Sequence, residues 1–166
     1  ARCTGNFRKR ICQIAIINSK GETLLDTLVK PVNPIPADAT LIHGITNEMV
    51  ARAPEFPSEK IYELIDSEHV IIYNASYDIQ LLQQSSLAVK DESDWYIAAH
   101  YHCAMKHFAT IYGDWNDYRK SYRWKSLSVA CGYYGIPVSE NVHSALADCL
   151  MTLEVCKKMA GINVTI

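Results

Sequence analysis

The hydrophobic pattern opens with two short apolar runs on either side of a turn. Residues 11–17 (ICQIAII) and 23–29 (TLLDTLV) are rich in strand-forming residues and are too short for stable helices. The segment between them, Asn18-Ser19-Lys20-Gly21, has the composition of a tight turn. We therefore predict an antiparallel hairpin. Prolines at positions 31, 34 and 36 end the hairpin and predict an irregular, extended stretch.

Helix-like and strand-like patterns alternate in the middle of the chain. Thr46 is suited to cap a short helix, and apolar residues on one face predict a helix over 58–65. The apolar run at 69–73 (HVIIY) predicts a strand that is covered on both faces. Ser76 is the expected N-cap of a helix that continues to Leu82, and the polar residues that follow predict a loop or a frayed helix end over 83–94.

The last third of the chain is predicted to contain a strand, a helix, a loop and two further helices. These segments are residues 95–99, 103–112, 113–124, 124–134 and 144–159. The apolar stripe of the final helix is expected at Leu146, Leu150, Leu153 and Cys156. Strands and helices in this order predict an α/β or α+β fold with a mixed sheet, in one domain that spans residues 1–166.

Bulk composition narrows the function only a little. The chain has 166 residues, 49% of them hydrophobic, which is enough to bury a proper core. A net charge of −2 argues against a protein that coats long nucleic acids, although it is compatible with an enzyme that binds only a few nucleotides. No apolar run reaches the ~20 residues that a membrane helix needs. The six cysteines are scattered, and we expect reduced thiols in a soluble cytoplasmic protein.

Two short segments carry candidate chemistry. In residues 73–78 (YNASYD) a strand ends, the chain turns, and Asp78 falls in the first turn of a helix. In residues 143–148 (HSALAD) His143 stands at a helix entrance and Asp148 follows five residues later. Either segment alone says little, because an acid near a helix N-terminus stabilises the helix by ~0.3–1 kcal/mol without any further role.

The set and its order are more specific. Together with the intervening His43-Gly44-Ile45-Thr46, the two segments make the chain resemble the DnaQ-like (DEDDh) 3'→5' exonucleases. The resemblance covers nearly the whole chain and rests on residues 10–17, 41–50, 70–78 and 142–148. It implies a ribonuclease-H-like fold, in which helices flank a mixed central sheet on both faces.

The resemblance also implies a reaction and its residues. Asp78 and Asp148 would bind metal, with two Mg²⁺ or Mn²⁺ ions in an intact family site, and His143 would deprotonate the attacking water. The substrate would be the 3' end of single-stranded DNA or RNA, and the products nucleoside 5'-monophosphates. A polymerase or another nucleic-acid-processing protein is the implied partner. The segments quoted suggest substrate contacts from Thr4, Gly5, His43, Asn74 and Tyr77, although a structural role for His43 is the better expectation.

The chain departs from the family at its first motif. The family opens with Asp-x-Glu-x-Thr-Gly, whereas this chain opens Ala1-Arg2-Cys3-Thr4-Gly5. Alignment on Thr4-Gly5 places Arg2 where the Glu belongs, and a shift by one places Ala1 and Cys3 at the two acids. Either the sequence is a truncated or altered form of an active enzyme, or it is a silent module that binds nucleic acid or a polymerase. We expect weak Mg²⁺ binding and slow cleavage from the residues given.

Two other clusters have alternative explanations. Residues 115–125 (WNDYRKSYRWK) alternate rings and cations, which suits single-stranded nucleic acid, so Arg119, Lys120 and Arg123 are candidate substrate ligands. The alternative is a solvated loop at the edge of the core. His100, His102, Cys103 and His107 could hold zinc, but a helical core residue among surface histidines is the better interpretation. A small interaction domain with fortuitous motifs is a third candidate. The sequence leaves open DNA or RNA as substrate, the cellular role and the oligomeric state.

Overall fold

The structure is a computed structural model that describes residues 2–3, 10–138 and 144–161, the first pair by its backbone alone. In chain order, the elements are β1 (Arg2–Cys3), β2 (Ile11–Ile17), β3 (Thr23–Leu28), α1 (Ala37–His43), α2 (Asn47–Val50), α3 (Ser58–Ile65), β4 (His69–Ile72), α4 (Ala75–Ala88), the 3₁₀ helix η1 (Trp95–Ile97), β5 (His100–Cys103), α5 (Ala104–Tyr112), β6 (Trp115–Asn116), β7 (Ser121–Tyr122), α6 (Leu127–Tyr134) and α7 (Ala145–Met159). None of the helices in these ranges is long and apolar enough to cross a membrane.

The predicted hairpin is confirmed, with β2 and β3 paired antiparallel. Its turn is held by the Asn18 side chain, whose Oδ1 accepts the backbone N–H groups of Lys20 and Glu22, each at 3.0 Å. Gly21 has a φ of 89°, a conformation that glycine adopts without the steric cost of a Cβ. The turn residues therefore match the turn that they form.

The strands form small sheets. β1, β2 and β3 make an antiparallel sheet, β4 and β5 pair in parallel, and β6 and β7 form an antiparallel pair. Among the described residues, β4 makes no ladder with β1 or β2. The mixed α/β arrangement is thus confirmed, while its strands are divided among separate sheets.

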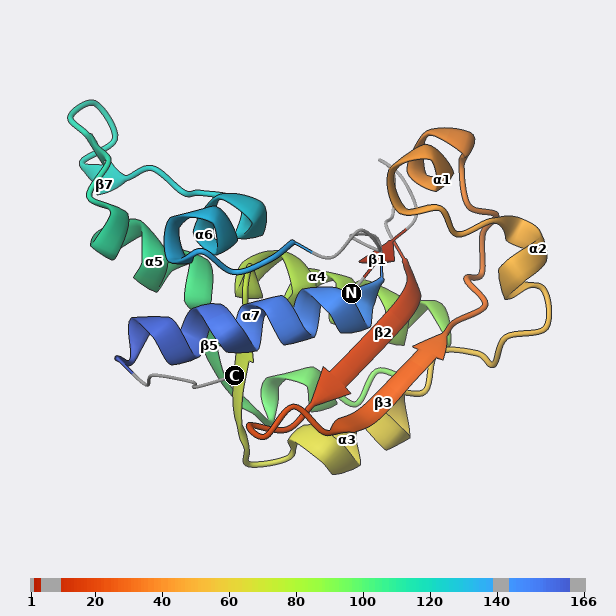
Figure 1. Ribbon diagram of the computed structural model, residues 1–166. Coiled ribbons are helices and arrows are strands. Elements are labelled where there is room, and N and C mark those ends of the chain that lie inside the picture. The colour runs from red at the N-terminus through yellow and green to blue at the C-terminus, as the bar shows by residue number, and fades with distance from the viewer. Residues whose placement is uncertain (1, 4–9, 139–143, 162–166) are drawn as a thin grey trace.

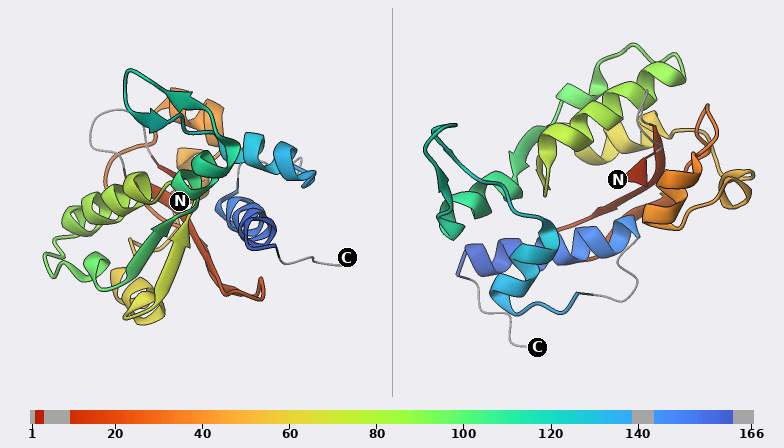
Figure 2. Two further views of the ribbon diagram at one scale, coloured as in Figure 1. Left: turned by 90° about the vertical axis from the view of Figure 1, so that its left-hand side faces the viewer. Right: turned by 90° about the horizontal axis from the view of Figure 1, so that it is seen from above.

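Helices cover β2 from both sides, and Figure 2 shows α7 on one face of the β2–β3 sheet with α4 and α3 on the other. Side chains of both long helices bond to the β2 backbone. The Ile11 N–H donates to Ser85 Oγ of α4 at 3.0 Å, and the Cys149 thiol of α7 donates to the Ala15 carbonyl at 3.4 Å. The central position of β2 in Figure 1 follows from these contacts.

Three apolar clusters make up the core. The main one joins Ile11 and Ile14 of β2 to Ile61 and Ile65 of α3 and Leu81 of α4. A second packs α1 and α2 against Cys12, through Ile35, Ala39, Ile45 and Val50. The third holds α5, α6 and α7 together, with Phe108, Ala130, Cys131, Met151 and Val155 buried.

The extended stretch expected after the prolines is wrong in part, because residues 37–43 form α1. Pro36 is its extended N-cap, a place where proline is tolerated since the first N–H groups of a helix lack partners within it. Gly44 ends α1 with a φ of 72° and donates its N–H to the Thr40 carbonyl at 2.7 Å.

The predicted helix ending near residue 82 continues to Ala88, and its N-cap is Asn74 where Ser76 was expected. Polar residues 83–86 suggested a loop, yet Ser85 and Ser86 are buried. Ser86 Oγ accepts the Trp95 indole N–H at 2.9 Å and donates to the Asp91 carbonyl at 3.0 Å. Tertiary hydrogen bonds therefore satisfy serines that a local pattern assigns to the surface.

The strand predicted at 95–99 is wrong. Residues 95–97 form η1, and the strand lies further along, at β5. The strand predicted at 69–73 exists as β4, but it is covered on one face only, because Ile71 is 53% exposed. The continuous apolar run suggested cover on both faces, but one of its apolar residues, Ile71, lies on the uncovered face.

The loop predicted at 113–124 contains a small antiparallel pair, and we call residues 115–122 the aromatic hairpin. It extends away from the body of the molecule (Figure 1). The helix expected from residue 124 begins at Leu127 instead, because Ser126 caps it by accepting the Val129 N–H at 3.3 Å.

The final helix is confirmed, but its predicted stripe is wrong. The buried residues of α7 are Ala145, Met151, Thr152 and Val155, and Leu150 is 41% exposed. This helix packs between β2 and α6. Its buried face is therefore set by these two neighbours and differs from the face that carries the leucines.

We expect Met151→Ala to lower the free energy of unfolding by about 2–5 kcal/mol, because it leaves a cavity in the third cluster. Leu150→Ala is the matched control on the same helix and should cost less than about 1 kcal/mol, since its side chain is already exposed. Urea denaturation measures both values. A larger cost for Leu150→Ala would show that the stripe predicted from the sequence is the buried one.

Candidate active site

Asp78 lies where the end of β4 turns into α4. The Asn74 carbonyl accepts the N–H groups of Tyr77 and Asp78, at 3.1 and 3.2 Å, and starts the helix. Asp78 is the acidic residue of the first turn and is partly buried. The predicted position of this carboxylate is therefore found at the carboxyl end of the strand, beside the exposed N–H groups of a helix N-terminus.

Asp148 occupies the same position in α7. Ser144 caps this helix, since its Oγ accepts the Ala147 N–H at 3.1 Å. The Asp148 N–H donates to the Ser144 carbonyl at 3.2 Å, and Asp148 is the acidic residue of the first turn. Each candidate metal ligand thus stands on the first turn of a helix that packs on β2.

Gln13 of β2 holds the start of α7 in place. Its Oε1 accepts the Ala145 N–H at 3.0 Å, and its Nε2 donates to Asp26 Oδ1 of β3 at 3.4 Å. One side chain therefore bridges the hairpin and the helix that carries Asp148. Sequence reasoning missed Gln13, although its position as the one polar residue of the apolar run 11–17 was a signal.

Cys149 shows that the two acids share one neighbourhood. The pKa of its thiol is raised to about 11, first by burial and then, in part, by the negative charges of Asp148, Asp78 and Asp26. Asp78 and Asp148 therefore both act electrostatically on one thiol. Burial followed by the charge of Asp148 also raises the pKa of Cys131 on α6. Asp78 and Asp148, 70 positions apart in the sequence, thus lie on two helices that pack against the same strand.

Of the other residues predicted for the site, His143, Thr4 and Gly5 lie outside the described residues. Asn74 and Tyr77 flank Asp78 at the start of α4, and Tyr77 packs partly against the main core cluster. Their contacts with substrate stay predictions.

His43 is held in the interior. It is buried, its Nδ1 accepts the Ile45 N–H at 3.1 Å, and its Nε2 lies 3.9 Å from Cys12 Sγ. These contacts account for the histidine as a structural residue, and its substrate contact stays a prediction. The preceding Leu41 and Ile42 are 87% and 66% exposed, so this segment presents apolar side chains to solvent instead.

The cationic residues of the aromatic hairpin have different surroundings. Arg119 and Lys120 are exposed at its turn, where Lys120 has a φ of 50°. Arg123 lies at its base and donates from Nη1 to Asp114 Oδ1 at 3.1 Å. Asp114 also accepts from Lys125, so this carboxylate braces the base of the hairpin.

The base of the hairpin is tied to the end of β4. The Tyr73 hydroxyl donates to the carbonyls of Lys125 and Ser126, at 2.9 and 3.0 Å. Burial raises the pKa of Tyr73, so the hydroxyl stays protonated as a donor. Because Tyr73 precedes the turn that leads to Asp78, these bonds place the hairpin base at the same end of the sheet as the candidate acids.

The residues present suit one divalent ion better than two. Mg²⁺ binds proteins through one or two carboxylates and completes its shell with water and substrate phosphates. Asp78 and Asp148 supply two carboxylates, but no group of three His, Cys, Asp or Glu side chains within 10–138 and 144–161 is arranged to hold a metal ion. The described donors therefore fit a single, weakly held Mg²⁺ or Mn²⁺.

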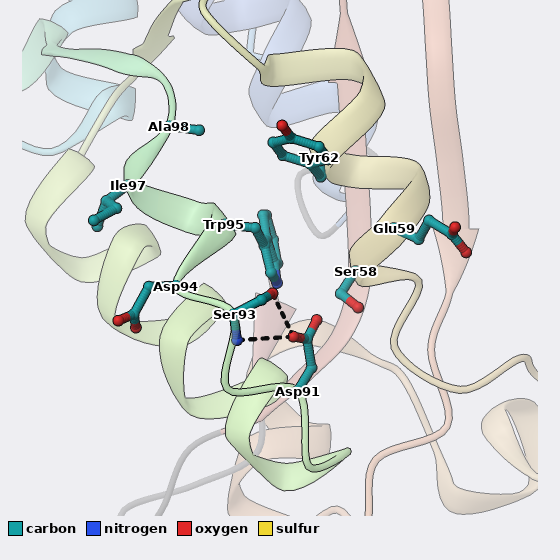
Figure 3. Close-up of a pocket in the computed structure, with 9 residues that line it drawn as sticks. All are labelled: Ser58, Glu59, Tyr62, Asp91, Ser93, Asp94, Trp95, Ile97 and Ala98. Carbon is teal, nitrogen blue, oxygen red and sulfur yellow. Dashed lines mark hydrogen bonds between the residues drawn. The ribbon is translucent and has the colours of Figure 1, made fainter.

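A cavity of about 520 Å³ lies away from these acids, between α3 and η1 (Figure 3). Its lining includes Glu59, Asp91 and Asp94, and Asp91 accepts two hydrogen bonds from Ser93. Bonds from Ser93 and then Ser58 lower the pKa of Asp91 to about 2, which keeps it ionised. This cavity adjoins the start of β5 while Asp78 follows the end of the parallel β4, so it lies at the opposite end of the sheet. Its negative lining does not suit a phosphate.

A family model described as Exonuclease (RNase T) matches residues 3–156. The chain belongs to this exonuclease family. A relative from Escherichia phage 186 called uncharacterized exonuclease CP81 is 39% identical over 155 residues, which are 90% of this chain and 79% of the relative. The expected membership of a DnaQ-like family is thereby confirmed.

Further relatives and a solved structure agree with this assignment. The DNA polymerase III subunit epsilon of Buchnera aphidicola is 29% identical over 131 residues, 75% of this chain and 52% of the relative. The chain thus spans about half of that subunit. A structure of Exonuclease X in complex with 5' overhanging duplex DNA has a TM-score of 0.65 at 23% identity and covers 97% of this chain and 89% of its own. That likeness confirms the ribonuclease-H-like fold.

The reactivity of Cys149 tests whether the two acids are neighbours. We expect Asp78→Asn and Asp148→Asn each to lower the pKa of the Cys149 thiol, because each removes a negative charge that raises it. More thiolate then forms at a given pH, so alkylation of Cys149 by iodoacetamide becomes faster at alkaline pH. Mass spectrometry of the Cys149 peptide across a pH series measures the rate.

The controls are an internal thiol and a distant acid. Cys156, whose pKa is raised by burial alone, should keep its rate in both variants. Asp91→Asn should leave the Cys149 rate unchanged. Equal Cys149 rates in the wild type and in either site variant would place that acid away from the thiol.

Proposed function

We propose that this protein is a DEDDh-type 3'→5' exonuclease that removes nucleoside 5'-monophosphates from the 3' ends of single-stranded DNA or RNA. The observation that carries the proposal is the placement of Asp78 and Asp148 on the first turns of two helices packed against one strand, around a common thiol. Membership of the exonuclease family supports the reaction class, and the polarity rests on the motif resemblance.

The geometry suits phosphodiester hydrolysis in two ways. Helix N-termini present N–H groups that favour anions, so the acids and an incoming phosphate both gain from the same dipoles. A divalent ion, when bound by Asp78 and Asp148, supplies Lewis-acid stabilisation of charge on the phosphate oxygens. In this proposal His143, five residues before Asp148, accepts the proton of the attacking water, a task suited to a side chain that titrates near neutral pH.

Slow turnover is part of the proposal. A two-ion mechanism needs more carboxylates than the described residues bring together, and Arg2 stands where the resemblance places a Glu. A cation at that position repels divalent ions and attracts phosphate, so it favours substrate binding over cleavage. The alternative is a protein of the same fold that binds nucleic acid or a polymerase without cleaving. It differs from the proposed enzyme only in whether Asp78 and Asp148 still support cleavage.

The aromatic hairpin is the proposed contact for the strand upstream of the cleaved end. Tyr118 is 95% exposed, and Trp115 and Trp124 also present their rings to solvent. Stacking of a base on an exposed ring is worth about 1–3 kcal/mol, and cations beside the rings follow the phosphates. A polymerase partner is proposed by analogy with the relatives named as subunits of DNA polymerase III.

We expect the 166-residue chain to shorten a 5'-labelled oligonucleotide from its 3' end slowly, and only with Mg²⁺ or Mn²⁺. Asp148→Asn should reduce the rate at least about tenfold to a hundredfold, because losing a metal ligand costs at least as much as losing a residue that orients one. Arg2→Glu should raise the rate, since it returns an acid to the first motif. Gel electrophoresis of time points measures all three.

The control is Asp91→Asn, which alters an acid at the opposite end of the sheet and should keep the wild-type rate. Shortening from the 5' end would refute the polarity. A rate that survives Asp148→Asn would remove the acids from the mechanism, and binding without any cleavage, even in Arg2→Glu, would favour the silent module.

The double variant Arg119→Ala with Lys120→Ala tests the hairpin. We expect weaker binding of single-stranded DNA and a shallower salt dependence, by about 0.7 in the slope of log K against log salt for each phosphate that the double variant no longer neutralises. Fluorescence anisotropy at several salt concentrations gives the slope. Lys60→Ala removes an exposed cation on α3, paired with Glu63 and outside the hairpin, and should change neither value. An unaltered slope in the double variant would exclude the hairpin from binding.

A further inference from the structure

Three histidines gather on the uncovered face of the β4–β5 pair. His69 is the register partner of His100, and His102 follows two residues later on the same face of β5. All three side chains are exposed, whereas the intervening Val70 and Tyr101 pack against the main core cluster. Parallel pairing thus places three imidazoles side by side on an open surface.

The distances within this group, which we call the histidine face, are short. His69 Nδ1 lies 2.9 Å from His102 Nε2. The ring centroid of His69 lies 5.1 Å from that of His100 and 5.2 Å from that of His102. With metal–nitrogen bonds of about 2.0–2.1 Å, two imidazoles on one tetrahedral ion have nitrogens roughly 3.3 Å apart and centroids about 5 Å apart. The centroid separations match those values, while the shorter N–N distance is that of a hydrogen bond between the two rings, which a bound ion would replace.

We infer that the histidine face binds a late first-row divalent ion of the zinc, nickel or copper class, with His69 and His102 as its first ligands and His100 as the third. Imidazole nitrogen is a preferred donor for these ions and a poor one for Mg²⁺. In the part of the chain described, no three such side chains are yet arranged to hold a metal ion, so the His100 ring has to turn toward the pair on binding.

This site differs from the histidine and cysteine cluster that the sequence suggested. Cys103 faces inward and its thiol donates to the Tyr73 carbonyl at 3.4 Å, so it belongs to the packing of β5. His107 lies on α5, outside the histidine face. The residue that completes the group, His69, lies 31 positions before His100 and is brought to it only by strand pairing.

The site is separate from the proposed catalytic acids. The three histidines lie on the uncovered face of the β4–β5 pair, whereas Asp78 lies beyond the end of β4, in the first turn of α4, so the two sites use different elements. A metal here would connect β4 to β5 at an uncovered surface and stabilise the folded chain, because the unfolded chain does not hold the three rings together.

Isothermal titration with Ni²⁺ in excess Mg²⁺ tests the inference, since Mg²⁺ occupies carboxylate sites and leaves imidazoles free. We expect one Ni²⁺ per chain and a rise in Tm on binding. His69→Ala and His102→Ala should each weaken binding at least about tenfold. His100→Ala should weaken it as well.

The matched control is His107→Ala, which removes an exposed histidine outside the group and should bind Ni²⁺ as the wild type does. Asp148→Asn should also leave the affinity unchanged, which separates this site from the proposed exonuclease centre. Circular dichroism confirms that each variant is folded. Undetectable Ni²⁺ binding by the wild type, or wild-type affinity in His69→Ala and His102→Ala, would overturn the inference.

Discussion

Strand β2 is held by hydrogen bonds to its own backbone from helices on both of its faces, and the rest of the molecule is arranged around that strand. Ser85 of α4 accepts the Ile11 N–H, and the thiol of Cys149 on α7 donates to the Ala15 carbonyl. Gln13 adds a bond to the first turn of α7. Because these bonds fix each helix along the strand, they also fix the two acids that the helices carry.

The electrostatics of the candidate site follow from this clamp. Two carboxylates near one buried thiol repel each other and raise its pKa, and a divalent ion relieves that repulsion. The same clamp leaves the β4–β5 pair uncovered on one face, where the histidines lie. The carboxylates beyond the end of β4 are hard oxygen donors, whereas the imidazoles on the uncovered face of β4–β5 are borderline nitrogen donors, so the two groups suit different classes of metal ion.

The aromatic hairpin depends on the packing beneath it. The helices before and after the hairpin, α5 and α6, pack together through the buried side chains of Phe108, Ala130 and Cys131. The Tyr73 hydroxyl donates a hydrogen bond to the Lys125 carbonyl, where the hairpin ends. These contacts connect the hairpin to the body at its base and leave its tip in solvent. Exposed rings and two cations at its turn therefore remain accessible to a ligand.

The sequence by itself determined the hairpin of β2 and β3, the placement of Asp78 and Asp148 in the first turns of two helices, and the family, because turn residues and ordered motifs are local signals. Predictions from the sequence failed where contacts with distant elements determine helix length or the buried face of a helix. Ser85 and Ser86 extend α4 because a distant strand and an indole satisfy them, and the buried face of α7 is chosen by β2 and α6. Only the tertiary structure brought Gln13 to the start of α7 and His69 to His100 and His102. Those contacts join residues far apart in the chain, and a local pattern holds no information on which strand face a distant element will cover.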